Sequence, residues 1–222
     1  MIKRLVIIGA GGHAREVAEI AHHQAAQGVP VVPLGFVDDN PRLKGQVLDG
    51  LPVLGDWTWF DDADRSSLVV ICAIGTPALC RRLVSKANEY RLSFTSVVSP
   101  LAHISDRARI GEGVMIFPHV VVNTGARIGD HSILNLGVSI SHDSSVGSFC
   151  NINPGVRIAG NAQVGDGCYV GMGTNVIQGR TIGAGTTVGA GAVVIRDLAS
   201  NITAVGVPAA VIKMKEEHWN EQ

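Results

Sequence analysis

The sequence predicts a small parallel α/β sheet followed by a parallel β-solenoid with three-sided coils, and three observations support this prediction. From Val98 to Val194 an aliphatic residue occupies every sixth position without a break. Ile-Gly or Val-Gly pairs recur every eighteen residues across the same stretch. Before Val98, apolar runs typical of strands alternate with helical patterns, which indicates a parallel sheet. We therefore expect two domains, residues 1–97 and 98–222.

The six-residue period is too regular to arise by chance. If Ile, Leu and Val make up about a quarter of a chain, the whole series has a probability on the order of 10⁻¹⁰. A helix requires apolar spacings of three and four, and Gly and β-branched residues weaken helices. A short strand in each hexad, with one aliphatic side chain pointing inward, explains the period. The positions are Val98, Ile104, Ile110, Ile116, Val122, Ile128, Leu134, Ile140, Val146, Ile152, Ile158, Val164, Val170, Val176, Ile182, Val188 and Val194.

The eighteen-residue period indicates that three hexads make one coil. The glycines of the Ile-Gly and Val-Gly pairs are Gly111, Gly129, Gly147, Gly165 and Gly183. Residues two places before the aliphatics are mostly small, as a narrow triangular interior requires. Examples are Ala108, Ala126, Ser144, Cys150, Ala162 and Cys168.

The first domain should place a ligand crevice beyond the carboxyl ends of its strands. The expected elements are strands at 4–9, 31–39, 67–74 and 93–98 and helices at about 13–27 and 77–90. The turn Gly9-Ala10-Gly11-Gly12 follows the first strand, an Asp pair ends the second, and Gly75 ends the third. These three features should therefore meet at one edge of the sheet.

The glycine-rich turn contains G-x-G-x-x-A at Gly9, Gly11 and Ala14 in a strand–turn–helix context. This pattern lets a phosphate approach the backbone at a helix N-terminus, although a merely tight turn is an equal alternative. Asp38 and Asp39 come late for the acidic residue that binds the ribose of NAD, and they could simply form a turn before Pro41. The domain is also small for a dinucleotide, so a single nucleotide-linked ligand fits better.

Composition narrows the class of protein. The formal net charge is −1 with 17% charged residues, which gives no sign of a nucleic-acid-binding surface. The start of the chain lacks a signal-peptide pattern, and no apolar run reaches the ~18 residues of a membrane span. The four cysteines have no metal-binding spacing. We expect reduced core cysteines, no metal and a cytoplasmic location.

Residues 135–171, NLGVSISHDSSVGSFCNINPGVRIAGNAQVGDGCYVG, together with IIGAGGHA at the start, AIG ending at Gly75 and GVPA near the end, carry a family resemblance. The chain resembles the bacterial hexapeptide-repeat acetyltransferases that N-acetylate nucleotide-linked 4-amino-sugars, grouped with sialic-acid O-acetyltransferases. The resemblance implies left-handed coils, acetyl-coenzyme A as co-substrate, a homotrimer with active sites between neighbours, and a role in bacterial surface-glycan biosynthesis. The expected acceptor is a sugar of the 4-amino-4,6-dideoxy type.

The resemblance also assigns a base. A histidine followed by an acidic residue is the general base in this family, which selects His142 and, as the residue that orients its ring, Asp143. His142 lies two places after the inward Ile140, so it should face outward at a corner of the coil. Histidine suits this task because its pKa lies near the working pH. The family more often has Glu at the second position, and a solvated corner histidine is the alternative reading of the residues alone.

Other family contacts map onto both domains. Acceptor contacts fall on Gly11, Gly12, His13, Asp38, Asp39 and Gly75, with Asn135 as a further polar candidate. Coenzyme contacts fall on Asn151, Met172 and Ala190. The last two are eighteen residues apart and should stack on successive coils, whereas Asn151 departs from the histidine that the family often has there.

Three alternatives remain beside N-acetylation. A sugar O-acetyltransferase acting on a sialic acid would use the same histidine. A non-catalytic trimeric nucleotide-binding scaffold would need neither histidine nor coenzyme. A zinc carbonic anhydrase is disfavoured because the chain lacks its H-x-x-x-x-H spacing. Val121, Phe117 and Phe149 near the flat outer sides suggest contacts between subunits.

Overall fold

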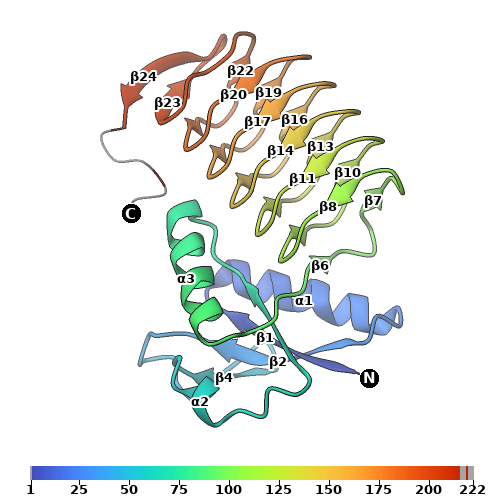
Figure 1. The fold of residues 1–222 in the computed structure, drawn as a ribbon, viewed down its shortest axis with the longest axis vertical. Helices are drawn as coiled ribbons and strands as arrows, with labels where there is room; N and C mark the ends of the chain where they lie inside the picture. The colour runs from blue at the N-terminus through green and yellow to red at the C-terminus, as the bar shows by residue number, and fades with distance from the viewer. Residues whose placement is uncertain (1, 216–218, 220–222) are drawn as a thin grey trace.

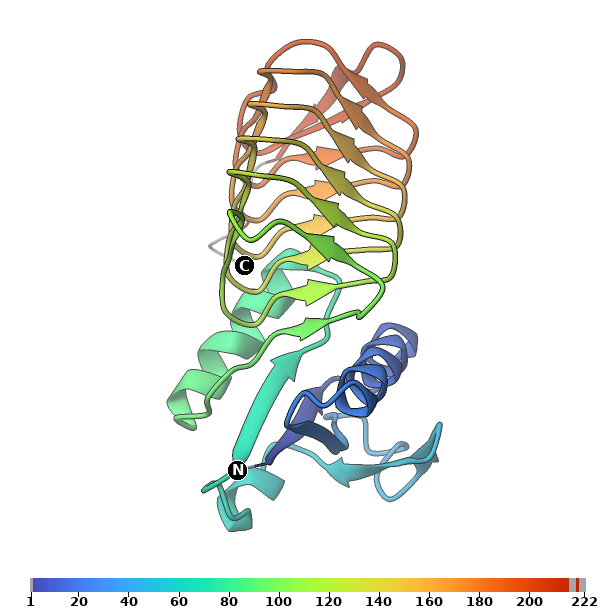
Figure 2. The ribbon, with the colours of Figure 1, turned by 90° about the vertical axis from the view of Figure 1, so that its right-hand side faces the viewer.

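The computed structural model describes residues 2–215 and 219, which form an α/β domain and a prism of stacked coils. The coils rise as one stack whose lower end meets β6 and the helices α1 and α3 (Figure 1). Viewed from the side, successive coils appear as evenly spaced rungs (Figure 2). The predicted fold class, an α/β domain followed by a left-handed parallel β-helix, is confirmed.

The α/β domain is built on a sheet with strand order β3-β4-β2-β1-β5. Its elements are β1 (Lys3–Ile8), α1 (Gly12–Ala26), β2 (Val31–Val37), β3 (Val47–Leu48), β4 (Leu51–Gly55), α2 (Trp59–Asp62), β5 (Leu68–Cys72) and α3 (Pro77–Glu89). β1 pairs in parallel with both β2 and β5, as the alternating strand and helix patterns predicted. The expected strand at 93–98 is reduced to a bridge between Phe94 and Val70 and the two-residue β6 (Val97–Val98).

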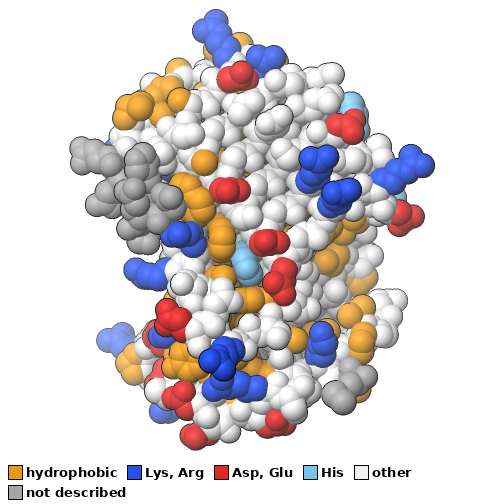
Figure 3. Space-filling view, viewed as in Figure 1, with side chains coloured by type: hydrophobic (Ala, Val, Ile, Leu, Met, Phe, Trp, Pro, Cys, Tyr) orange, Lys and Arg blue, Asp and Glu red, His pale blue; other side chains and the backbone are white. Residues whose placement is uncertain are grey.

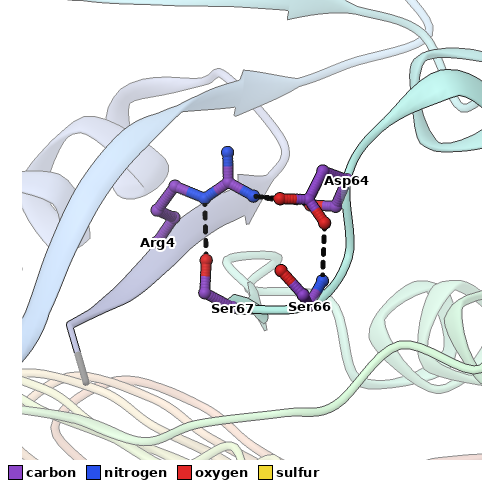
Figure 4. Close-up of polar contacts among 4 residues, drawn as sticks. All are labelled: Arg4, Asp64, Ser66 and Ser67. Carbon is purple, nitrogen blue, oxygen red and sulfur yellow. Dashed lines mark hydrogen bonds and ion pairs between the residues drawn. The ribbon is translucent and has the colours of Figure 1, made fainter.

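The start of β1 is fastened to the loop before β5 by a small polar network (Figure 4). Arg4 donates from Nε to Ser67 Oγ at 3.0 Å and from Nη2 to Asp64 Oδ2 at 3.1 Å. Asp64 Oδ1 accepts the backbone N–H of Ser66. This hydrogen bond is the main reason that the pKa of the Asp64 carboxyl lies below its usual value. The network holds the two neighbouring strands in register at the end of the sheet away from the crevice.

The sheet is not purely parallel, which corrects the prediction. β3 and β4 form an antiparallel hairpin around Asp49 and Gly50, whose φ angles are +48° and +85°. Two consecutive positive φ values are the mark of a tight two-residue hairpin turn. Arg15 of α1 donates to both carboxylate oxygens of Asp49, at 2.6 and 2.9 Å, so the hairpin tip is tied to the first helix.

The prism has three sides, each a ladder of short parallel strands spaced by eighteen residues. Side 1 contains β7 (His103–Ile104), β10 (Val121–Val122), β13 (Ser139–Ile140), β16 (Arg157–Ile158), β19 (Asn175–Val176) and β22 (Val193–Val194). Side 2 contains β8 (Arg109–Ile110), β11 (Arg127–Ile128), β14 (Ser145–Val146), β17 (Gln163–Val164) and β20 (Thr181–Ile182). Side 3 contains β6, β9 (Met115–Ile116), β12 (Ile133–Leu134), β15 (Asn151–Ile152), β18 (Tyr169–Val170), β21 (Thr187–Val188), β23 (Ile202–Val205) and β24 (Ala210–Met214).

The predicted aliphatic positions form the core of the prism. From Ile116 to Val194 all of them are at most 3% exposed, and the first three, Val98, Ile104 and Ile110, are half-buried against the same core. The glycine period has a steric cause on side 2. A Cβ on Gly129 would lie 2.5 Å from backbone atoms of the next coil, so that column has no room for a side chain.

Several of the small inward residues are polar, and each has a specific partner. Ser132 Oγ donates to Gly147 O at 2.7 Å and accepts the N–H of Cys150. Hydrogen bonds from a side chain to the carbonyl fifteen residues further on also begin at Ser96, Ser144, Cys150, Cys168 and Thr174. The interior position therefore selects small hydrogen-bond donors as well as small apolar residues, because a buried carbonyl without a partner is costly. The cysteines are free and buried, as predicted.

The stack ends with two strands that depart from the six-residue period. After Val194 the six-residue phase fails, but β23 joins side 3 in parallel beside β21 and β24 folds back antiparallel to it. All five residues of β24 are exposed. Residues 216–218 and 220–222 of the predicted tail lie outside the described residues.

The α/β domain packs against side 3 through aromatic contacts at two levels. The ring of His13 stacks on Phe117 with 5.4 Å between centroids. The ring of His131 stacks on Phe149 and meets Phe94 edge-on at 4.6 Å. Phe117 is 2% exposed within its own chain, so it is not available for the expected subunit contact. Phe149 and Val121 are half-buried, and their role in subunit contacts stays a prediction.

The surface carries charges of both signs, interspersed on the face shown in Figure 3. Within residues 2–215 and 219, no helix is both long and apolar enough to cross a lipid bilayer.

Candidate functional site

Three turns of the α/β domain meet at the carboxyl ends of its strands, where the crevice is predicted. The N–H of Gly9 donates to Val37 O at the end of β2, and the N–H of Ala73 donates to Ile8 O at the end of β1. The glycine-rich turn thus lies between the ends of β2 and β5. Gly11 and Gly12 are exposed, and a Cβ at either one would have no heavy atom within 4 Å. The start of α1 is therefore open to a ligand, with its first N–H groups lacking intrahelical partners.

Asp38 and Asp39 make different contacts. Asp38 accepts the N–H of Ala10 through Oδ2 and the N–H of Asn40 through Oδ1, both at 2.9 Å. Its carboxylate therefore braces the glycine-rich turn as well as the turn that follows. Asp39 is more exposed and lies 3.8 Å from the ammonium group of Lys86. Of the two carboxylates, Asp39 is the more available to a ligand.

His13 lies inside the crevice with one nitrogen unused. Its Nδ1 is 3.6 Å from Glu16 Oε2, and its buried Nε2 has no hydrogen-bond partner among the described residues. Burial lowers the pKa of His13, although the neighbouring Glu16 opposes this shift. Burial therefore favours the neutral form of His13.

The side chains of Asn135 and Asn151, both from side 3, make different hydrogen bonds within the chain. Asn135 Oδ1 accepts the N–H of Leu136 at 2.7 Å, so this oxygen serves the local turn. Asn151 is 7% exposed and donates from Nδ2 to Gly75 O at 2.7 Å. Asn151 thus lies beside the crevice of its own chain, a contact between residues far apart in sequence that no local pattern indicated.

His142 lies on the edge between sides 1 and 2 and faces outward, as predicted. Its side chain is 53% exposed, and its Nδ1 lies 3.0 Å from Asp143 Oδ2. With the Nδ1 proton directed at this carboxylate, the lone pair on Nε2 is free to accept a proton. The shorter Asp side chain therefore reaches the ring.

Two glycines on neighbouring coils make room for this pair. A Cβ on Gly160, eighteen residues after His142, would lie 2.5 Å from His142 Nε2. A Cβ on Gly125, eighteen residues before Asp143, would lie 2.4 Å from Asp143 Oδ1. Sequence reasoning overlooked both glycines, although the eighteen-residue period already placed them above and below the pair.

Two of the three predicted coenzyme residues, Met172 and Ala190, lie on another edge, between sides 3 and 1, whereas Asn151 lies within side 3. The N–H of Gly191 donates to Met172 O at 2.8 Å, so Met172 and Ala190 occupy the same corner of successive coils. The Met172 side chain is 60% exposed. Leu101 and Leu136, both exposed, lie on lower coils of the same edge. The edge offers an apolar strip to a ligand.

One chain does not bring these parts together. The α/β domain covers side 3, and the edge that carries His142 is opposite this side in a three-sided prism. The crevice around Gly11 and Gly75 and the imidazole of His142 therefore face different directions within one molecule. In the part of the chain that the structure describes, no group of three or more metal-ligating side chains is present.

Comparisons with known proteins agree with this fold. Residues 4–87 match the family model for the PglD N-terminal domain. Perosamine N-acetyltransferase from Caulobacter crescentus, solved with coenzyme A and GDP-perosamine, is 37% identical. The match covers 96% of this chain and 98% of that one, with a TM-score of 0.87.

Two further structures show the same architecture. The acetyltransferase domain of PglB from Neisseria gonorrhoeae, solved with acetyl-coenzyme A, is 29% identical, with coverage of 96% of this chain and 100% of that one and a TM-score of 0.87. WeeI from Acinetobacter baumannii is 27% identical, with coverage of 94% and 99% and a TM-score of 0.85. No match is found among curated protein sequences.

The fold and the paired domains define a hexapeptide-repeat acyltransferase. With the 37% identity over nearly the whole chain, the protein belongs to the bacterial sugar acetyltransferases of this class, enzymes that use acetyl-coenzyme A as acetyl donor.

Proposed function

We propose that this chain N-acetylates a nucleotide-linked amino-sugar of the 4-amino-4,6-dideoxy type, with His142 as general base, in bacterial surface-glycan biosynthesis. Residues 1–97 hold the nucleotide part of the acceptor, and residues 98–222 supply the base and the coenzyme edge. The observation that carries the proposal is the exposed His142 with Nδ1 held by Asp143 at 3.0 Å. The complex of perosamine N-acetyltransferase with coenzyme A and GDP-perosamine supports the choice of acceptor.

The chemistry requires one proton acceptor and close alignment. The acceptor amine attacks the thioester carbonyl, and the nitrogen then loses a proton to His142 Nε2. The tetrahedral intermediate collapses with cleavage of the carbon–sulfur bond, and the coenzyme leaves as a thiol after taking up a proton. Asp143 stabilises the imidazolium that forms in between. General base catalysis contributes roughly 10²–10⁴ in rate, and alignment contributes further.

The active unit is a homotrimer in this proposal. Because the His142 edge is opposite side 3, the imidazole reaches an acceptor held by the α/β domain of a neighbouring subunit. Met172 and Ala190 line the path of the pantetheine arm. The flat outer surfaces of sides 1 and 2 are the surfaces left for neighbours, since side 3 is covered by the α/β domain.

Mass spectrometry after incubation with acetyl-coenzyme A tests the function. The acceptor panel contains UDP-, GDP- and dTDP-linked 4-amino-sugars together with free sialic acid. A gain of one acetyl group on an amino-sugar is the expected result. Acetylation of sialic acid alone would point to O-acetyl transfer, and no turnover on any acceptor would point to a binding scaffold.

Substitution of His142 tests the mechanism. His142→Ala should lower kcat by ~10²-fold or more, and His103→Ala, an exposed histidine on the first coil, should leave it unchanged. A mixed trimer of His142→Ala and Asp38→Ala subunits should recover activity that neither variant has alone. Near-normal turnover of His142→Ala would remove this residue from the mechanism.

A further inference from the structure

A cavity lies between α1 and the lower end of the edge between sides 3 and 1. It has a volume of about 330 Å³, within the range of small-molecule pockets. One wall is formed by α1, through Glu16, Glu19, Ile20 and His23. The other wall is formed by the prism, through Leu101, Phe117, Pro118 and Leu136. This cavity, called the α1–prism cavity below, combines an apolar wall with two carboxylates.

The apolar wall is accessible in the single chain. Leu101 is 63% exposed and Leu136 is 44% exposed. Single scattered surface aliphatics need no explanation, but these two leucines line the same cavity. Their arrangement indicates an occupant with an apolar part.

Two contacts connect the cavity with the predicted acceptor crevice. Phe117 of the apolar wall stacks on His13, with 5.4 Å between ring centroids. Glu16 Oε2 lies 3.6 Å from Nδ1 of the same histidine. Glu16 is also about one helical turn beyond Gly12, where α1 begins. A ligand whose phosphates lie at Gly11 and Gly12 can therefore extend along α1 into the cavity.

The cavity continues the edge that carries Met172. The N–H of Gly137 donates to Pro118 O at 3.1 Å, and the N–H of Gly155 donates to Leu136 O at 2.9 Å. Pro118 and Leu136 therefore occupy the same corner of successive coils, and Met172 lies two coils above Leu136. The apolar strip ends in the cavity, where α1 closes it. A pantetheine arm that passes Met172 on its way down this edge directs its thioester toward the cavity.

In the proposed trimer, the base of a neighbouring subunit reaches the same level. His142 follows Leu136 by six residues, which is a third of a coil. Successive coils are spaced by roughly 4.8 Å. Subunits packed side by side around an axis along the stack have equivalent residues at equal heights. His142 of the neighbouring subunit therefore lies within about one coil of Leu136 along the stack, at the upper end of the cavity.

A larger hollow on α1 does not offer this path. It has a volume of about 490 Å³ and is lined by Gly12, Arg15 and Asp49 among others, but by no described residue of the prism. Arg15 and Asp49 are already hydrogen-bonded to each other there. A sugar in this hollow would lie away from the strip that carries Met172.

We propose that the α1–prism cavity binds the sugar ring of the acceptor and selects its chemistry. Leu101 and Leu136 contact the methyl group of a 6-deoxy-sugar, and Glu16 and Glu19 accept hydrogen bonds from its hydroxyl groups. The two carboxylates repel a sugar that carries a carboxylate of its own, such as a uronic acid or a sialic acid. The inference rests on the proposed function, because it assigns a binding site to the sugar of the same acceptor.

Three acceptors that share one nucleotide test this selection. They carry a 4-amino-4,6-dideoxy-sugar, its counterpart with a hydroxyl group on C6, and its counterpart with a carboxylate at C6. The nucleotide is the one that the wild-type protein uses best. Relative to the 6-deoxy acceptor, kcat/KM should be about tenfold lower for the 6-hydroxy acceptor and ~10²-fold or more lower for the 6-carboxylate acceptor. Equal kcat/KM for the three acceptors would overturn the inference.

Two substitutions test the two walls separately. Leu101→Asn places an amide against the methyl group, so it should lower kcat/KM for the 6-deoxy acceptor by about tenfold and weaken the preference over the 6-hydroxy acceptor. Glu19→Gln removes one of two like charges, so it should raise kcat/KM for the 6-carboxylate acceptor by about tenfold. The KM for acetyl-coenzyme A should stay unchanged in both variants.

Matched controls replace similar side chains outside the cavity. Val47→Asn removes an exposed aliphatic side chain on β3, and Glu89→Gln removes an exposed carboxylate at the end of α3. Neither residue lines the cavity, so neither control should change the ratios among the three acceptors. Equal melting temperatures for all variants would show that the fold is intact.

The outcomes separate this inference from the proposed function. Unchanged ratios among the acceptors in both Leu101→Asn and Glu19→Gln would overturn the inference but not the proposed function. A higher KM for acetyl-coenzyme A with unchanged ratios would assign the cavity to the coenzyme and would also overturn the inference. If the wild-type protein acetylates none of the sugar nucleotides, the proposed function fails and the inference fails with it.

Discussion

Replacing Gly160 by alanine should displace the imidazole of His142, the proposed general base, without disturbing the fold. The new Cβ would lie 2.5 Å from His142 Nε2 and 2.6 Å from Cε1. The ring must retreat by about 0.9 Å to reach an ordinary contact of 3.4 Å. Because the ring is 53% exposed, it has room to move, and the movement would lengthen or break its 3.0 Å contact with Asp143.

Gly160→Ala is expected to lower kcat. A misplacement of about 1 Å can cost ~10²-fold in turnover, which corresponds to about 2.7 kcal/mol in activation free energy. Stability should be maintained, because Gly160 is not in the left-handed region and Gly→Ala at a compatible site stabilises by about 0.4–1 kcal/mol. Release of coenzyme A thiol, followed with a thiol-reactive dye, measures kcat, and thermal unfolding measures stability.

A double-mutant cycle tests the reasoning. In a His142→Ala background the alanine at position 160 contacts no imidazole, so it should cause little further decrease in kcat. Wild-type kcat in Gly160→Ala would refute the reasoning. The same fold decrease in kcat on adding Gly160→Ala to the wild-type protein and to His142→Ala would also refute it, since the effect would then not depend on the imidazole ring.

Three further results are expected. The pKa values of His13 and His131 in the folded protein are lowered, chiefly by burial. The unfolded chain therefore binds more protons at these histidines than the folded protein does below about pH 6.5. Because this difference favours unfolding, the melting temperature should fall as the pH is lowered from 7 to 5. A constant melting temperature over this range would contradict the assignment. Gly129→Ala places a Cβ 2.5 Å from the backbone of the next coil and should destabilise by about 1–3 kcal/mol in denaturant unfolding, unlike Gly160→Ala, whose Cβ meets a movable side chain. Ser132→Ala leaves a buried carbonyl and a buried N–H without their partner and should cost about 1–3 kcal/mol; an unchanged denaturation midpoint would show that water replaces the hydroxyl.

The prism was predictable because its constraints are local and repeated. Each hexad places one aliphatic residue inward, and the glycines of side 2 mark every coil. The outward direction of His142 followed from its distance to Ile140 in the same hexad. Gly160 was equally predictable, since adding eighteen to 142 gives the residue stacked on the imidazole.

Contacts between the domains were not predictable in the same way. Outward aromatic residues such as Phe117 and Phe149 look alike whether a neighbouring subunit or the chain's own α/β domain covers them. The pairing of Asn151 with Gly75 joins residues 76 positions apart, and only the docking of the two domains creates it. The β3–β4 hairpin is different, because Asp49-Gly50 between short apolar runs is a recognised hairpin signal.

The eighteen-residue ladder also limits how the length of this protein can change during evolution. Removal of one hexad before Met172 would turn every later residue by one side, so that Met172 and Ala190 would move together to a different edge. Whole coils can be gained or lost without this rotation, but a coil gained or lost between His142 and Met172 would change the distance along the stack between these two side chains. Loops of variable length are therefore expected before Val98 and after Val194, where no register has to be kept.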